Sequence, residues 1–122
     1  MTTMRYYSLS LFLILSLFTS LASAQSLPSI TPAATYTNSD GNTLTETTIS
    51  ESAPLAVSFI SGAENTDGWT AHYEWRFYKE GKRNAPYLIR YDKETSYTFT
   101  DAGTHRVELW ATFIQGTDTI EY

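Results

Sequence analysis

The sequence predicts an all-β protein: an antiparallel β-sandwich of six to seven short strands, preceded by a helical signal peptide. Several segments alternate apolar and polar residues with a period of two, which separates the two faces of a strand. Clusters of Gly, Asn and Asp divide these segments at intervals typical of a sandwich, and no amphipathic helix is visible. The length of 122 residues suits one domain, and 15% aromatic against 17% charged residues argues against disorder.

Composition excludes several kinds of chemistry. The chain has no cysteine, so it has no disulfide framework, thiolate nucleophile or thiolate metal site. The formal net charge is −5, and an acidic protein gains nothing from counterion release on a phosphate backbone. We therefore expect no nucleic-acid partner.

Residues 1–24 are predicted to be a signal peptide. Arg5 precedes an apolar run at 9–21, which is long enough for the hydrophobic region of such a peptide and short for a bilayer span. The run ends at Ala22-Ser23-Ala24, a pattern that signal peptidase accepts, so the exported chain would begin at Gln25. An uncleaved membrane anchor is the alternative. Loss of Arg5 leaves seven Lys and Arg against thirteen Asp and Glu, a net charge of −6.

An extended leader is expected over 25–35, where Pro28 and Pro32 stand among Ser, Thr and Ala. The sandwich domain is expected over 36–122. Its first feature is a tight turn at 38–42 (Asn-Ser-Asp-Gly-Asn), because Gly and Asn tolerate positive φ.

The remaining strands follow from alternation and turn residues. An edge strand rich in threonine is expected first, and the predicted segments are 43–49, 55–60, 71–78, 87–91, 96–100, 106–113 and 119–122. Gly103 is expected to give the turn before the longest strand a backbone conformation that a side chain would hinder. The apolar faces supply a predicted core of Leu55, Val57, Phe59, Tyr73, Trp75, Phe77, Phe99, Val107, Leu109 and Phe113.

Two stretches carry a resemblance to a known family. Residues 73–77 (Tyr-Glu-Trp-Arg-Phe) are similar to the strand that holds the tryptophan–x–phenylalanine core pair of polycystic kidney disease (PKD) domains. Residues 96–109 resemble the second signature of that family, a β-prone run, a glycine turn and an alternating strand. The resemblance covers about residues 53–122 and implies an immunoglobulin-like sandwich of the kind found in bacterial surface proteins.

The resemblance has a clear departure. The family's usual loop after the tryptophan is Asp-Phe-Gly-Asp-Gly, whereas this chain has Arg76-Phe77-Tyr78-Lys79-Glu80-Gly81, so no role of those aspartates carries over. The chain looks most like PKD-like domains of Bacteroidetes surface proteins, several of which precede a gliding-motility-associated carboxy-terminal sorting module of type IX secretion. The resemblance implies further domains of a longer parent protein, with this chain truncated at or near its last strand.

Catalytic, cofactor-binding and metal residues are not assigned. His72 and His105 are expected on different strands as exposed histidines, and Asp92 and Glu94 in a solvated loop. No nucleophile elbow, zinc-protease motif or phosphate loop occurs.

Calcium is left open as a cofactor at 38–42. Asn38, Asp40 and Asn42 alternate oxygen ligands, as in a calcium loop. That loop needs a glutamate at its twelfth position, with the first ligand counted as position one. Counted from Asn38, the twelfth position is Ile49, so a β-turn is favoured.

Three aromatic residues are candidates for surface recognition. Tyr78 and Trp110 fall on the polar sides of their strands, and Trp69 lies in a Gly- and Asp-containing loop. A flat ring can stack on a sugar or on another protein. The alternatives are packing against a neighbouring domain, or a one-residue error in the face assigned to Trp110.

The function predicted from these observations is non-catalytic. We expect an extracellular spacer, adhesion or protein-interaction module of an exported bacterial surface protein, with a protein or glycan partner at the cell surface. A carbohydrate-binding module that uses the exposed aromatics is the alternative, and a secreted inhibitor or small hydrolase is a weaker third. The cell surface or extracellular space is favoured over the periplasm, and no membrane span is expected after signal cleavage.

Overall fold

The computed structural model describes residues 26–122 and the backbone of residues 4–11. The described chain is built from strands without any helix, so the prediction of an all-β fold is confirmed, and no described helix could cross a membrane. The predicted number of strands was too low. Residues 4–11 and 26–122 contain ten: β1 (Met4–Leu11), β2 (Ala33–Thr37), β3 (Thr43–Glu46), β4 (Thr48–Ser52), β5 (Leu55–Ile60), β6 (Thr70–Lys79), β7 (Leu88–Arg90), β8 (Glu94–Phe99), β9 (Thr104–Gln115) and β10 (Asp118–Glu121).

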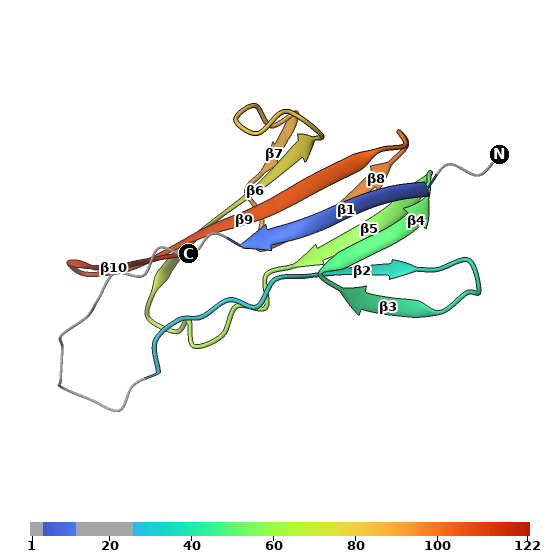
Figure 1. Cartoon of the computed structure of the whole chain (residues 1–122). Helices are drawn as coiled ribbons and strands as arrows, with labels where there is room; N and C mark the ends of the chain where they lie inside the picture. Colours follow the sequence, from blue (N-terminus) through green and yellow to red (C-terminus); the bar gives the residue numbers. More distant parts are fainter. Residues whose placement is uncertain (1–3, 12–25) are drawn as a thin grey trace.

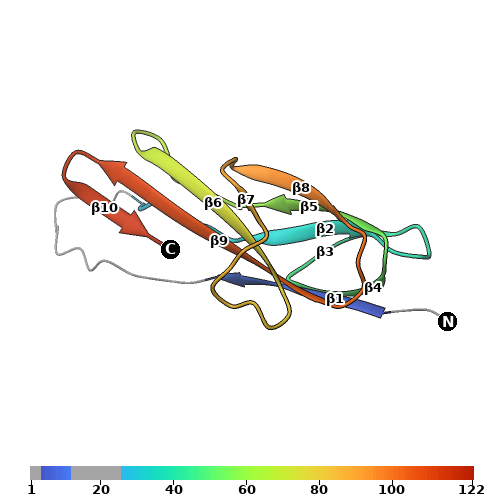
Figure 2. The ribbon, with the colours of Figure 1, turned by 90° about the horizontal axis from the view of Figure 1, so that it is seen from above.

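The strands form two sheets that pack into a sandwich (Figures 1 and 2). The larger sheet has the order β4-β1-β9-β6-β7, with β10 also paired to β9, and the smaller has the order β3-β2-β5-β8. Among the described strands, every pairing is antiparallel except that of β1 with β9, which is parallel.

One predicted edge strand, 43–49, is in fact two strands in different sheets. Leu44 in β3 pairs with Tyr36 of the smaller sheet, whereas Ile49 in β4 is fully buried and belongs to the larger sheet. The chain changes sheet at Thr47. Alternation alone cannot show this, because a strand that turns a sandwich corner keeps its period of two on both sides.

Residues Met4–Leu11 of the predicted signal peptide form a strand, β1, where a helix was expected. The rest of the predicted signal peptide lies outside the described residues. Here the helical prediction was wrong. The segment alternates Tyr, Ser and Leu, a pattern that suits a strand, and it has strands on both sides with which to pair.

The core lies between the two sheets and is mainly aromatic. Phe59 of β5 lies 5.7 Å from the ring of Trp75 and 5.5 Å from that of Phe77, and Phe99 lies 6.3 Å from Phe59 (centroid distances). Such tilted and edge-on pairs bury large apolar areas in a protein without disulfides. Every predicted core side chain is buried except Tyr73, which is partly buried, and Gly103 has the expected positive φ, 126°. The buried apolar set is Ile30, Ala34, Tyr36, Ile49, Leu55, Val57, Phe59, Trp75, Phe77, Tyr78, Phe99, Val107, Leu109, Ala111, Phe113 and Ile120.

The leader packs against the sandwich along much of its length. Ile30 is buried, the amide of Thr31 donates to the carbonyl of Ser61 at 2.9 Å, and the hydroxyl of Tyr122 donates to the carbonyl of Pro28 at 2.8 Å. Strand β2 begins at Ala33, inside the predicted leader. The extended chain therefore contributes to the core before the first strand of the smaller sheet starts.

Candidate functional site

The outer face of the smaller sheet carries short hydroxyl side chains in register across its four strands. Thr35 of β2 pairs with Thr45 of β3 and with Ser58 of β5, and Ser58 pairs with Ser96 of β8. Residues paired directly across a sheet share a face, so these four form one row. We call this surface the hydroxyl face, and it comprises Thr35, Thr37, Thr43, Thr45, Ala56, Ser58, Ser96 and Thr98.

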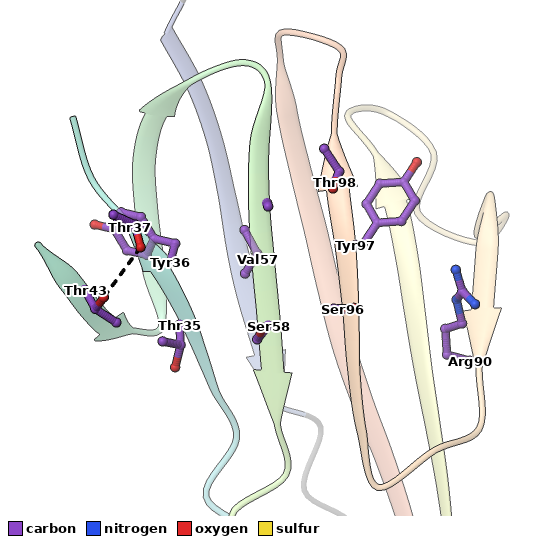
Figure 3. Close-up of a pocket in the computed structure, with 11 residues that line it drawn as sticks. Thr35, Tyr36, Thr37, Thr43, Val57, Ser58, Arg90, Ser96, Tyr97 and Thr98 are labelled. Atoms are coloured by element: carbon purple, nitrogen blue, oxygen red, sulfur yellow. Dashed lines mark hydrogen bonds between the residues drawn. The ribbon is translucent and has the colours of Figure 1, made fainter. Parts of the chain in front are cut away.

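The hydroxyl face is slightly hollowed. A depression of about 550 Å³ lies over β2, β5 and β8, with Arg90 of β7 at its edge (Figure 3). Two pairs of hydroxyls bond across β2 and β3, with Oγ1 atoms 3.1 Å apart in Thr35–Thr45 and 3.5 Å apart in Thr37–Thr43. A hydroxyl can donate and accept, so the face can bind polar ligands without contributing a nucleophile–base pair.

The outer face of the larger sheet is a ladder of charged and aromatic side chains on β6 and β9. The guanidinium carbon of Arg76 lies 4.2 Å from the ring centroid of Trp110, and that of Arg106 lies 4.5 Å from the ring of Tyr78. Glu108, although buried, accepts from Arg106 Nε at 3.1 Å and from Trp110 Nε1 at 3.3 Å. Cations over rings are favourable, and the carboxylate of Glu108 is charge-paired.

Arg76 links this ladder to Glu74, whose carboxylate accepts from its Nε. Burial lowers the pKa of Arg76, but the hydrogen bonds and charges of Glu74 and Tyr78 act in the opposite direction and raise the pKa overall. The guanidinium therefore stays charged over Trp110.

The ladder changes the interpretation of two candidate recognition residues. Tyr78 is only 4% exposed, so the prediction that its ring is exposed was wrong. The structure places Trp110 on the outer face, but its ring is half-buried and Arg76 covers it. Period-two alternation assigns a side chain to a face and cannot show that a long neighbour folds over it.

Trp69, the third candidate, lies apart from the other two. It is partly buried in the loop that precedes β6, where a depression of about 330 Å³ is lined by Ser26, Asn65, Asp67, Trp69 and Gln115. The side-chain amide of Gln115 donates to the carbonyl of Gly68 at 3.2 Å, which holds that loop against the end of β9. A ring beside amide and carboxylate groups is a combination that suits a sugar.

The two histidines differ in environment. His72 is exposed, as expected, whereas His105 is 4% exposed, so its predicted exposure was wrong. Position 105 shares the inner face of β9 with Val107, and its Nδ1 lies 3.2 Å from the hydroxyl of Tyr87 while Nε2 lies 3.2 Å from the carbonyl oxygen of Asp101. His105 is therefore a hydrogen-bonded core residue.

The turn at 38–42 uses its own oxygen. Asn38 Oδ1 accepts from the amides of Asp40 at 3.0 Å and Asn42 at 2.9 Å, as in an Asx turn. Asp92 and Glu94 are both exposed. Among residues 4–11 and 26–122, no three His, Asp or Glu side chains are grouped as metal ligands would be.

The hydroxyl face was missed by the sequence analysis, although a signal was present. Threonine or serine recurs at alternate positions in three strands, at 35 and 37, 43 and 45, and 96 and 98. Only the register brings these pairs side by side.

Comparison of the chain with models of protein families, with curated proteins and with solved structures finds no match.

Proposed function

We propose that this protein is a non-catalytic β-sandwich module of an exported bacterial surface protein and serves in adhesion or protein interaction through the hydroxyl face. The observation that carries the proposal is the uninterrupted row of Thr45, Thr35, Ser58 and Ser96 on an outer sheet face. At these positions the side chains are small and uncharged, so a partner that forms hydrogen bonds to them avoids the larger cost of desolvating charged groups.

Side-chain entropy supports the same function. Threonine is restricted at χ1 and loses little freedom when a partner docks, whereas the longer Lys and Glu side chains lose more. The hydroxyls present donors and acceptors at regular strand spacings of about 4.8 Å, which a complementary polar surface can match. Rigid presentation of such a face requires a well-packed interior, and the aromatic core supplies it.

We also propose that the sandwich is a PKD-like, immunoglobulin-like domain. Its support is the position of Trp75 and Phe77, both fully buried on β6 and in contact with Phe59. A core role for this pair agrees with the signature that carried the resemblance. We extend the proposal to a Bacteroidetes surface protein with a spacer-like domain.

Export is tested by mass spectrometry. When the full chain is produced with its own first 24 residues in a Gram-negative host, the protein outside the inner membrane should begin at Gln25. Ala24→Arg should block cleavage and leave the protein in the membrane fraction, because the small residue before the cut is lost. Recovery of an intact amino terminus in the exported fraction would contradict the proposal.

Binding through the hydroxyl face is tested with protein-coated beads. Ser58→Arg places a long cation in the middle of the face, whereas Thr112→Arg places one on the outer face of the larger sheet as a matched control. Beads that carry the wild type or Thr112→Arg should be retained on immobilised bacterial cells. Ser58→Arg should lower the binding affinity at least about 10-fold, a change of about 1.4 kcal/mol in binding free energy. Equal loss by both variants would show charge sensitivity without a specific face.

A carbohydrate-binding module is the second candidate function, favoured by the position of Trp69 beside Asn65, Asp67 and Gln115. Under this alternative, binding on a glycan array is lost in Trp69→Ala and retained in Trp110→Ala, whose ring Arg76 already covers. Retention in Trp69→Ala would exclude it.

A further inference from the structure

Strand β9 is shared by two different strands along one edge. Its other edge pairs with β6 from His105 to Ile114. Along the first edge, β10 pairs with residues 112–115 and β1 with residues 104–109, so β10 and β1 follow one another end to end (Figures 1 and 2). Half of this edge therefore depends on β1.

Strand β4 depends on β1 even more completely. Within the described part of the chain, β4 pairs with no strand other than β1, through positions 48–52. We call the space between β4 and β9 that β1 occupies the strand slot. Its two walls are the backbones of β4 and of β9 at 104–109, and Ile49, Val107 and Leu109, all fully buried in the complete chain, line its inner side.

The walls of the slot cannot simply join each other. Adjacent strands lie about 4.8 Å apart, so β4 and β9 are about two spacings from each other with β1 between them. If β1 were removed, main-chain donors and acceptors on both walls would lose their partners, and buried apolar side chains would meet water. An inserted strand restores both sets of contacts.

Register shows which strand fits. Position 5 of β1 pairs with Glu51, position 7 with Ile49 and with His105, and position 9 with Val107. Glu51 is half-buried and close enough to Tyr36 to raise the pKa of that phenol. A strand in this slot therefore needs a basic residue opposite Glu51 and apolar residues at every second position after it, and the segment at Met4–Leu11 has Arg5, Tyr7, Leu9 and Leu11 at these places.

We propose that the strand slot of the exported protein is an acceptor site for an extended segment of a partner polypeptide with the pattern basic–x–apolar–x–apolar–x–apolar. The segment runs antiparallel to β4 and parallel to β9, as β1 does. This inference rests on the proposed export, because cleavage after Ala24 removes β1 and opens the slot. Main-chain hydrogen bonds to both walls supply affinity, and the alternating side chains supply specificity.

The test begins with the folded full chain carrying a protease site within residues 12–24. After cleavage, a fluorescent peptide with the sequence of residues 4–11 is added and its anisotropy is measured. The cut chain should bind the peptide at least 10-fold more tightly than the uncut chain, because a tethered strand competes at an effective concentration of about millimolar. Equal binding to cut and uncut chain would overturn the proposal.

A scrambled peptide is the first control. It has the same composition in the order Tyr-Tyr-Leu-Leu-Ser-Ser-Met-Arg, so that no placement in the slot puts a basic residue opposite Glu51 and apolar residues at the three alternate positions that follow. Its affinity should be at least about 10-fold lower. Equal affinity of the two peptides would show non-specific hydrophobic adsorption and would overturn the proposal.

A charge exchange tests the position opposite Glu51. Glu51→Lys in the cut chain should lower its affinity for the wild-type peptide. The peptide with Arg5→Glu should bind that variant with restored affinity. Glu94→Lys, on β8 of the other sheet, is the matched control and should bind the wild-type peptide normally. In a Glu51→Lys variant whose circular dichroism spectrum matches that of the wild type, a loss of binding without rescue would count against the assigned register.

Two further outcomes overturn the proposal. If the cut chain binds no peptide and forms dimers, a second copy fills the slot. If it binds no peptide and stays monomeric, the slot is not an acceptor site for an extended segment. Failure of export is a separate result: an exported protein that retains residues 1–24 contradicts the proposed function, while peptide binding to the cut chain is still measured independently.

Discussion

Trp75 is fully buried, and its polar atom is nevertheless satisfied. Its indole Nε1 donates to the carbonyl oxygen of Asp92 at 2.9 Å, across the segment that joins β7 to β8. A buried N–H without a partner costs about 1–3 kcal/mol. The single residue therefore serves two purposes: the ring fills the space between the sheets, and its N–H holds a surface loop in place.

Gly62 has a backbone requirement that a neighbouring segment enforces. Its φ is 60°, and a Cβ at this position would lie 2.3 Å from the carbonyl oxygen of Thr31 in the leader. Gly62→Ala should therefore lower the free energy of unfolding by at least about 2 kcal/mol, through backbone strain together with displacement of the leader. Urea denaturation followed by tryptophan fluorescence measures this change.

Gly81→Ala is the matched control. Gly81 also has a positive φ, 77°, but a Cβ there meets no atom within 4 Å. Only backbone strain is then added, about 1 kcal/mol. Equal losses in the two variants would mean that contact with Thr31 contributes nothing.

Tyr36 makes stability dependent on pH in the alkaline range. Burial, reinforced by its hydrogen bond to Glu46 Oε2 at 2.9 Å and by the charges of Glu46 and Glu51, raises the pKa of Tyr36 from 10.0 to about 12. The unfolded chain loses this proton first, so unfolding releases a proton between pH 10 and 12 and stability falls with rising pH there. Below pH 10 the contribution is complete.

We expect Tyr36→Phe to flatten this alkaline loss when urea midpoints are compared from pH 9 to 12. Tyr91→Phe removes an exposed phenol (68% exposed) and should keep the wild-type profile. A Tyr36→Phe profile as steep as that of the wild type would assign the pH dependence to other groups.

Strand β9 shows how one element supplies two different surfaces. Its inner positions, among them Val107, Leu109 and Phe113, are fully buried in the core. Its outer positions join β6 in the arginine–aromatic ladder, where Arg76 covers Trp110. The period of two separates these sets, and the antiparallel register then sets which cation reaches which ring.

A double-mutant cycle tests the pairing of β6 with β9 on this face. Arg76→Ala and Trp110→Leu should show a coupling energy of about 0.5–1 kcal/mol in urea denaturation, as expected for a partly exposed cation–ring contact. The pair Lys79 and Tyr87 is the control, because its nitrogen lies 5.7 Å from the ring centroid and the lysine is exposed. Additive effects for Arg76 and Trp110 would show that their contact is incidental.

At the scale of the whole molecule, the leader is part of the fold. Ile30 is 8% exposed and joins the hydrophobic core, whereas Leu27, three residues earlier, is 47% exposed. The bond from Tyr122 to the carbonyl of Pro28 ties the leader to the end of the described chain. The sandwich is thus closed by segments that lie far apart in sequence.

Ile30→Ser should lower the free energy of unfolding by about 2–4 kcal/mol, because it removes buried apolar surface and introduces a hydroxyl into the core. Leu27→Ser, the same kind of change on the surface, should stay within about 0.5 kcal/mol of the wild type. Thermal unfolding followed by circular dichroism compares the two. A small effect of Ile30→Ser would show that the leader can detach without loss of the sandwich.

Sequence alone determined the fold class and most of the core. Alternation at 55–60, 71–78 and 106–113 assigned Phe59, Trp75, Phe77 and Val107 to the interior, because a strand has only two faces and an apolar face must be covered. It also located the turn at 38–42, where the side chain of Asn38 accepts a backbone hydrogen bond and Gly41 has a positive φ.

Only the tertiary structure decided how these strands meet. The division of 43–49 between two sheets, the burial of Tyr78 under Arg106, the inward position of His105 and the row of hydroxyls on the smaller sheet all depend on register between residues distant in the chain. The same holds for β1, whose pairing with β4 and β9 no local pattern indicates. Periodicity is a local property of the backbone, whereas pairing and covering are decided by the partners that folding brings together.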